Sequence, residues 1–165
     1  MERQVLAQVL GKLRFSAPLP EAALDRLVSF ATLCGFPAGT TIFREGDRND
    51  RLLIITVGRV ALDMSVPARG DTRILTLGPG DLVAWSALLG DGRMTTSAVA
   101  LEDTQVVAIS AQEVLSACGV NHDFGYSLMR RVADALAERL QATRLQLLDL
   151  FADSAPVIPL ETKGR

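Results

Sequence analysis

The stretch FPAGTTIFREGDRNDRLLIITVGRVAL, residues 36–62, decides the fold class. Its short runs are rich in apolar and β-branched residues, and Gly39, Gly46 and Gly58 separate them. Runs of this kind between turn-forming residues are typical of β-strands. Further runs of the same kind follow at residues 72–81, 95–103 and 104–110. Because no long helical pattern interrupts them, residues 35–110 are predicted to form a β-roll of the jelly-roll or double-stranded β-helix kind.

Helical periodicity flanks this region on both sides. Apolar stripes indicate helices within residues 1–34, and a helical period returns over residues 111–152. Ser110 is followed three residues later by a glutamate, which is the spacing of a capping box at a helix start. The sequence therefore predicts one α+β domain over residues 1–152, followed by a flexible tail at 153–165.

The long helical segment from about Phe124 to Ala152 carries an apolar seam at heptad spacing. Such a seam is typical of two helices that pack side by side. We therefore predict a parallel homodimer through this helix; the alternative is a seam that packs back onto the roll of the same chain. The residues predicted to form the dimer contact are Leu136, Leu140, Thr143, Leu147 and Leu150. Leu145 and Leu148 form a second apolar edge beside it.

Composition and charge exclude several classes of protein. The 165 residues carry a net charge of only −2, which does not favour general nucleic-acid binding. No apolar run is long enough for a membrane helix, and the amphipathic N-terminus does not resemble a signal peptide. Cys34 and Cys118 lie far apart, outside any metal-binding spacing, and are expected to be free thiols. We therefore expect a cytoplasmic protein.

The sequence offers no Ser-His-Asp or Cys-His arrangement that indicates a catalytic centre. His122 is the only histidine, so a metal-dependent enzyme of the cupin class, which needs several histidines, is disfavoured. No metal or catalytic residue is expected, and the protein is expected not to be an enzyme. The chain ends soon after Leu150, which leaves no room for a recognition helix, so direct DNA binding is not expected.

Three stretches together resemble the cyclic nucleotide-binding domains of the cyclic-AMP receptor and anaerobic-regulator superfamily. They are residues 36–62, the turn LGPGDLV at 77–83, and LAERLQATRLQLL at 136–148, which is similar to the family's dimer helix. The resemblance runs from about Leu24 to Leu150. It implies a ligand-sensing module, with cyclic AMP or cyclic GMP as the possible ligand. In the family, a glutamate holds the ribose, an arginine clamps the cyclic phosphate, and a polar residue of the long helix touches the base.

This sequence departs from the family at the residues that bind the nucleotide. The family pattern Phe-Gly-Glu-x-x-Leu corresponds here to residues 83–88, where Ala84 replaces the glycine and Trp85 replaces the glutamate. The phosphate-binding position falls on Met94 or Thr95, depending on the alignment, and neither is basic. An indole N–H is a donor only and cannot accept a hydrogen bond from the ribose. Trp85 either plugs the pocket or stacks on a flat ligand.

The resemblance also selects the candidate ligand-binding residues. They are Ala84, Trp85, Ser86, Ala87, Leu88, Arg93, Thr95, Thr96, Ser97, Thr143 and Arg144. Arg93 could supply the missing positive charge after a shift of one residue; otherwise it is an exposed arginine on a turn. Losing two hydrogen bonds to charged groups, at about 1.5–3 kcal/mol each, predicts cyclic nucleotide binding that is weak or absent.

We therefore expect a homodimeric regulatory module with a non-standard pocket, which acts through a partner protein. One alternative is a transcription regulator of the cyclic-AMP receptor type that has lost, or been cut from, its DNA-binding domain.

Overall fold

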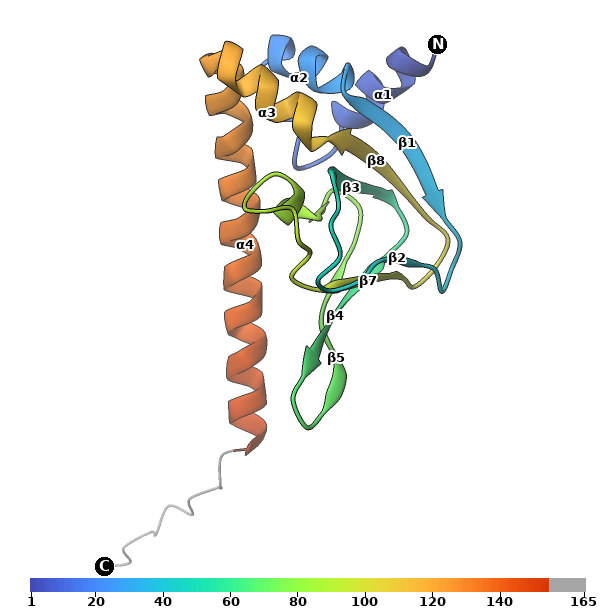
Figure 1. Cartoon of the computed structure of the whole chain (residues 1–165), viewed down its shortest axis with the longest axis vertical. Helices are drawn as coiled ribbons and strands as arrows, with labels where there is room; N and C mark the ends of the chain where they lie inside the picture. The colour runs from blue at the N-terminus through green and yellow to red at the C-terminus, as the bar shows by residue number, and fades with distance from the viewer. Residues whose placement is uncertain (155–165) are drawn as a thin grey trace, which may run out of the picture.

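The computed structural model describes residues 1–154, which form two antiparallel sheets with helices on one side and at one end (Figure 1). The helices are α1 (Glu2–Leu10), α2 (Glu21–Val28), the short 3-10 helix η1 (Trp85–Ala87), α3 (Ala111–Val120) and α4 (His122–Ser154). The strands are β1 (Ala31–Phe36), β2 (Thr41–Phe43), β3 (Arg51–Val57), β4 (Val60–Val66), β5 (Gly70–Leu77), β6 (Leu82–Val83), β7 (Ser97–Ala100) and β8 (Thr104–Ser110). The predicted α+β fold with a jelly-roll β-roll is confirmed.

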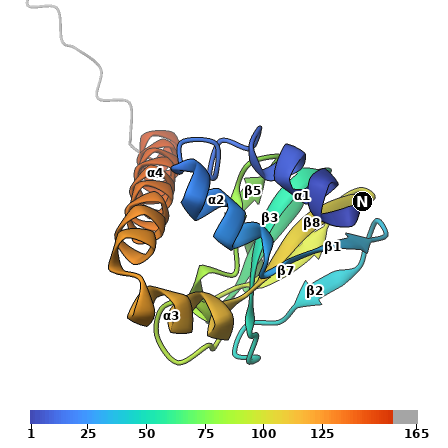
Figure 2. The same ribbon diagram turned by 90° about the horizontal axis from the view of Figure 1, so that it is seen from above.

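The strands pair in the orders β1-β8-β3-β6 and β2-β7-β4-β5, and every pairing between named strands is antiparallel. Their inward-facing side chains, with Met94 from the loop before β7, form a roll core that contains Phe43, Ile55 and Val106. A second core joins the outer face of the first sheet to α1, α2, α3 and the start of α4. Figure 2 shows α2 lying across this sheet and α4 at its side.

Two tight turns depend on glycine at Gly58 and Gly80. Gly58 has φ of 93°, and a Cβ there would lie only 2.5 Å from the Thr104 Oγ1. Gly80 has φ of 86° in the turn between β5 and β6. This conformation is strained for residues that carry a Cβ. These positions allow the roll to reverse direction within few residues.

The first predicted boundary is wrong, because the helical region 1–34 ends at Val28 and the roll begins with β1 at Ala31 rather than at residue 35. Ala31 lies at the helical spacing of the preceding apolar residues, which extended the predicted helix too far. In the structure Ala31 instead pairs with Ile109 of β8. Strand pairing with a distant segment has overridden the local helical pattern.

The second boundary agrees with the sequence. Ser110 caps α3, and its Oγ accepts a hydrogen bond of 3.4 Å from the backbone N–H of Glu113. The last helix, α4, includes Asp153 and Ser154, which were predicted to belong to the tail. The rest of the predicted tail, residues 155–165, lies outside the described residues.

The long helix α4 is packed at its beginning and exposed over its second half. Phe124, Leu128 and Val132 are buried in the helical core. Among element pairs, α4 packs mainly against α3 and α2 rather than against any strand of the roll. From there α4 runs down the side of the roll (Figure 1). None of the helices within residues 1–154 is long and apolar enough to cross a bilayer.

Candidate functional site

The segment that corresponds to the family's ligand-binding turn leaves β6 through a left-handed residue. Ala84 has φ 61° and ψ 36°, a conformation that suits glycine better than alanine. The family pattern has glycine at this position, so the backbone conformation is retained although the residue has changed. The chain then forms η1, in which Trp85 is half-buried and Ser86 is buried.

A cavity of about 180 Å³ lies between this segment, the roll and α4; we call it the cassette cavity. Six of the predicted ligand-binding residues line it: Ala84, Trp85, Ser86, Thr95, Thr96 and Thr143. Its other lining residues are Phe43, Leu62, Ile74, Leu75, Met94 and Arg139. The structure thus brings together residues from η1, from the loop before β7 and from α4, although they are up to about 60 positions apart in sequence.

The remaining predicted residues do not line the cavity. Leu88 is buried in the helical core, and Ala87 packs between the two cores. Ser97 Oγ accepts a hydrogen bond of 2.9 Å from the backbone N–H of Glu45. Arg144 is exposed on α4, one residue beyond the cavity.

Arg93 also lies outside the cassette cavity. Its guanidinium donates to the Gly46 carbonyl at 3.2 Å and lies 3.6 Å from the Asp91 carboxylate. Its backbone forms an isolated bridge with Arg48. The side chain is therefore occupied by its own loop and by the neighbouring one.

Both candidate phosphate-binding positions, Met94 and Thr95, line the cavity, and neither is basic. The Met94 side chain is only 3% exposed and belongs to the roll core. Backbone hydrogen bonds of 2.8 Å fix it, because the Met94 N–H donates to the Asp47 carbonyl and its own carbonyl accepts from the Gly46 N–H. The cavity wall is therefore apolar at this position.

Trp85 contributes a flat apolar surface to the same cavity. Its side chain packs against the helical core and lines the cavity, which remains open beside it. The indole is half-buried, so it forms part of the wall rather than a fully enclosed plug. An aromatic face in this position can stack on a planar ligand.

Arg139 of α4 supplies the positive charge that the cavity otherwise lacks. Its guanidinium donates a hydrogen bond to the Leu82 carbonyl, and within residues 1–154 it forms no ion pair with a carboxylate. Burial lowers the pKa of Arg139, while the more distant charge of Asp81 acts in the opposite direction. A half-buried cation without a paired carboxylate can bind an anionic ligand.

The ligand-binding list drawn from the sequence omitted Arg139. A signal was present, because Arg139 lies four residues before Thr143 and therefore on the same face of a helix. The two residues are also linked directly, since Thr143 Oγ1 donates to the Arg139 carbonyl at 2.8 Å. This bond leaves the oxygen of the Thr143 hydroxyl free to accept.

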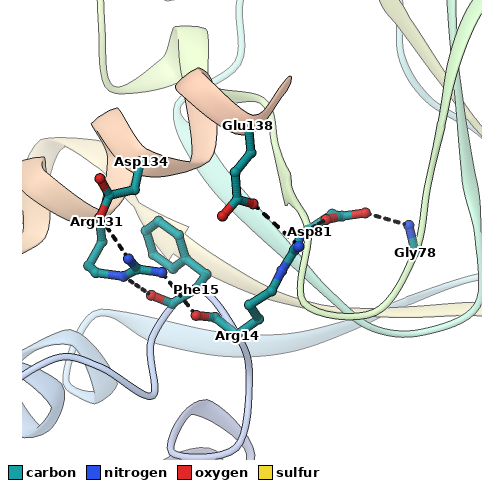
Figure 3. A network of polar contacts seen from close by, with 7 residues as sticks. All are labelled: Arg14, Phe15, Gly78, Asp81, Arg131, Asp134 and Glu138. Carbon is teal, nitrogen blue, oxygen red and sulfur yellow. Dashed lines mark hydrogen bonds and ion pairs between the residues drawn. The ribbon is translucent and has the colours of Figure 1, made fainter. Parts of the chain in front are cut away.

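A second cavity, of about 250 Å³, lies next to the first and shares Arg139 and Leu75 with it. Polar side chains surround it in a network that joins three parts of the chain (Figure 3). Arg14, in the connector between α1 and α2, lies 2.6 Å from Asp81 before β6 and 3.3 Å from Glu138 on α4. Within residues 1–154, no group of His, Cys, Asp and Glu side chains is arranged to hold a metal ion.

Comparison with known proteins identifies the family to which the chain belongs. A family model described as the cyclic nucleotide-binding domain matches residues 34–121. The CRP-like cAMP-activated global transcriptional regulator of Mycobacterium tuberculosis is 29% identical over 90% of this chain and 65% of its own length. The chain therefore covers less than two thirds of this relative.

Two solved structures share the fold. A putative cyclic nucleotide-binding protein from Geobacter metallireducens has a TM-score of 0.71 and 27% identity, and the match covers 85% of this chain and 98% of that one. A cyclic nucleotide-binding domain from Methylobacillus flagellatus has a TM-score of 0.78 at 18% identity, covering 96% of this chain and 86% of that one. The second likeness concerns the fold alone.

Proposed function

Because the chain belongs to the cyclic nucleotide-binding domain family, we propose that it is a regulatory module that binds a small anionic ligand in the cassette cavity. The observation that carries this proposal is the position of Arg139. It brings a half-buried positive charge from α4 to a cavity whose other walls come from η1 and the roll. A ligand in this cavity contacts α4 and the roll at once, so its binding energy can favour one position of α4 over another.

The chemistry of the walls selects the class of ligand. A flat ring stacks on Trp85, an anionic group pairs with Arg139, and the oxygens of Thr143 and Ser86 accept hydrogen bonds. Cyclic AMP and cyclic GMP have these features, but no carboxylate lines the cavity to hold a ribose. We therefore propose that cyclic nucleotides bind weakly. Their affinity should be at least about a hundredfold lower than that of a site with both the ribose-binding glutamate and the phosphate-binding arginine.

The size of the cavity suits either a ligand smaller than a nucleotide or a cavity that widens when the ligand binds. Its volume of about 180 Å³ is below the range of roughly 300–1,000 Å³ that is usual for ligand pockets. A nucleotide-sized ligand therefore requires the Arg139 side chain or α4 to shift. This requirement links binding to a change in α4.

We propose that α4 also forms the homodimer. Leu140 and Leu147 are exposed large apolar residues, two helical turns apart on the predicted seam. The full set proposed for the contact is Leu136, Leu140, Thr143, Leu147 and Leu150. Since Thr143 belongs both to this seam and to the cavity wall, a dimer contact would lie next to the ligand.

The output is proposed to be a partner protein that reads the position of α4. A second candidate follows from the name of the curated relative, which is a transcriptional regulator. In that case the chain is the ligand-binding part of a DNA-binding regulator. Because the second proposal places DNA binding outside these residues, duplex-DNA binding is measured by fluorescence anisotropy on the protein as it occurs in the cell; specific binding favours the regulator, and no binding favours a partner protein.

The ligand proposal is tested by calorimetric titration with cyclic AMP and cyclic GMP, with Trp85 fluorescence followed in parallel. We expect weak binding that changes the indole signal and is lost in Arg139→Gln. Arg144→Gln is the matched control, because Arg144 lies on the same helix outside the cavity. Binding that survives Arg139→Gln, or no binding by either nucleotide up to millimolar concentration, contradicts the proposal.

A further inference from the structure

Few contacts hold the second half of α4 against the roll. Beyond Val132, both cavities lie between α4 and the strands, and the main packing partners of α4 are α3 and α2. Polar bridges cross this gap. One is the hydrogen bond from Arg139 to the Leu82 carbonyl, and the other passes through Arg14.

Arg14 lies in the connector between α1 and α2, and its backbone is fixed by α4. Arg131 donates hydrogen bonds to the Arg14 carbonyl at 3.0 Å and to the Phe15 carbonyl at 2.8 Å. Arg131 is itself held by Asp134 at 2.8 Å (Figure 3). Because its backbone is held, Arg14 loses less freedom than an ordinary surface arginine when it forms ion pairs.

The connector also lies directly against the turn that precedes β6. A Cβ on Gly80 would lie 3.3 Å from the Arg14 Cβ, so glycine allows the two segments to approach. Asp81, the next residue, uses one carboxylate oxygen to accept from the Gly78 N–H at 2.9 Å and the other to accept from Arg14. Asp81 is four residues before Trp85, so a contact that holds Asp81 also holds the start of η1, which lines the cassette cavity.

The Arg14 guanidinium therefore joins the turn before β6, which leads to η1, to the helix α4. It pairs with Asp81 at 2.6 Å and with Glu138 at 3.3 Å, and Glu138 is the neighbour of Arg139 on α4. We propose that Arg14 is a positioning residue for the cassette cavity. It sets α4 against β6 and couples the position of α4 to that of η1. This inference rests on the proposed function of the cavity, but its test needs no ligand, so the two can fail separately.

The three charged side chains of this bridge are partly or largely exposed to solvent. Ion pairs of this kind contribute little to global stability, so loss of Arg14 should leave the protein folded. It should instead shift the local equilibrium between closed and open positions of α4. With two such pairs lost, the open population should rise between about twofold and thirtyfold.

Hydrogen–deuterium exchange of the ligand-free protein measures this population. Arg14→Gln should accelerate exchange in both residues 82–88 and residues 135–144. Arg14→Lys should have an intermediate effect, because an ammonium group cannot span two carboxylates as a guanidinium does. Arg59→Gln is the matched control; it removes an exposed ion pair with Glu102, neither of which lines either cavity, and should leave both segments unchanged.

Two further measurements separate positioning from simple anchoring of the connector. Glu138→Gln, on α4, should accelerate exchange in residues 82–88 although it leaves the Arg14–Asp81 pair in place. Salt at about 0.5 M should also accelerate exchange in residues 82–88 of the wild type, because it screens the ion pairs. It should not change exchange in Arg14→Gln, which has already lost these pairs. Faster exchange confined to residues 11–20, or to only one side of the cavity, overturns the proposal.

Discussion

Replacing two leucines of the α4 seam should convert the proposed dimer into a folded monomer. Leu140 and Leu147 are 53% and 54% exposed in the single chain. Fully burying a leucine side chain contributes about 1.5–3 kcal/mol, so covering the exposed half contributes about 1 kcal/mol. A symmetric dimer covers four of these side chains, which amounts to about 4 kcal/mol, or roughly three orders of magnitude in Kd.

The variant Leu140→Glu/Leu147→Glu removes this contribution and places four carboxylates in the seam. Sedimentation velocity over a range of concentrations should show a dimer for the wild type and a monomer for the variant, with unchanged far-UV circular dichroism. The matched control is Leu145→Glu/Leu148→Glu, since these leucines are 58% and 62% exposed on the other edge of α4. A wild-type monomer, or a loss of dimer that is equal in both variants, would contradict the proposed α4 dimer contact.

Three other predictions concern the stability of the single chain and are measured by urea unfolding. Ala84→Gly should leave stability unchanged or raise it by up to about 1 kcal/mol, because the left-handed conformation strains alanine; a loss greater than that would contradict this. Gly58→Ala should lower the free energy of unfolding by more than about 2 kcal/mol, since its Cβ would lie 2.5 Å from Thr104 Oγ1. Gly39→Ala, with open space around the new Cβ, should lower it by only about 1 kcal/mol. Equal losses in the two variants would count against the steric explanation. Burial raises the pKa of the Cys118 thiol, so the folded state binds this proton more tightly than the unfolded state. The stability that this difference contributes is present below the pKa of the unfolded thiol, about 8.5, and is lost as the pH rises through the pKa of the folded thiol. Cys118→Ala should reduce this loss of stability at high pH. An unchanged dependence of stability on pH would show that Cys118 does not cause the loss.

The order of elements could be predicted because it is recorded in local patterns. The glycines at 39, 46 and 58 separate the strands, and Ser110 marks the start of α3. The strand β1 was not predicted, because Ala31 continues the apolar spacing of α2. Only its pairing with β8, which lies far away in sequence, makes this segment a strand.

The candidate site was predictable in part for a similar reason. The residues of η1 could be placed by their resemblance to a known turn, and six of the predicted residues do line the cavity. The sequence left the phosphate-binding position open between Met94 and Thr95, and both residues line the cavity. Arg139 was left out of the candidate residues although its place four residues before Thr143, on the same helix face, could have indicated it.

The ligand proposal is best tested by a crystal structure of the protein grown with millimolar cyclic AMP. We expect a nucleotide in the cassette cavity, with its phosphate within hydrogen-bond distance of Arg139 and its base against Trp85. A cavity without nucleotide, or a phosphate bound by Arg93 instead, would contradict it.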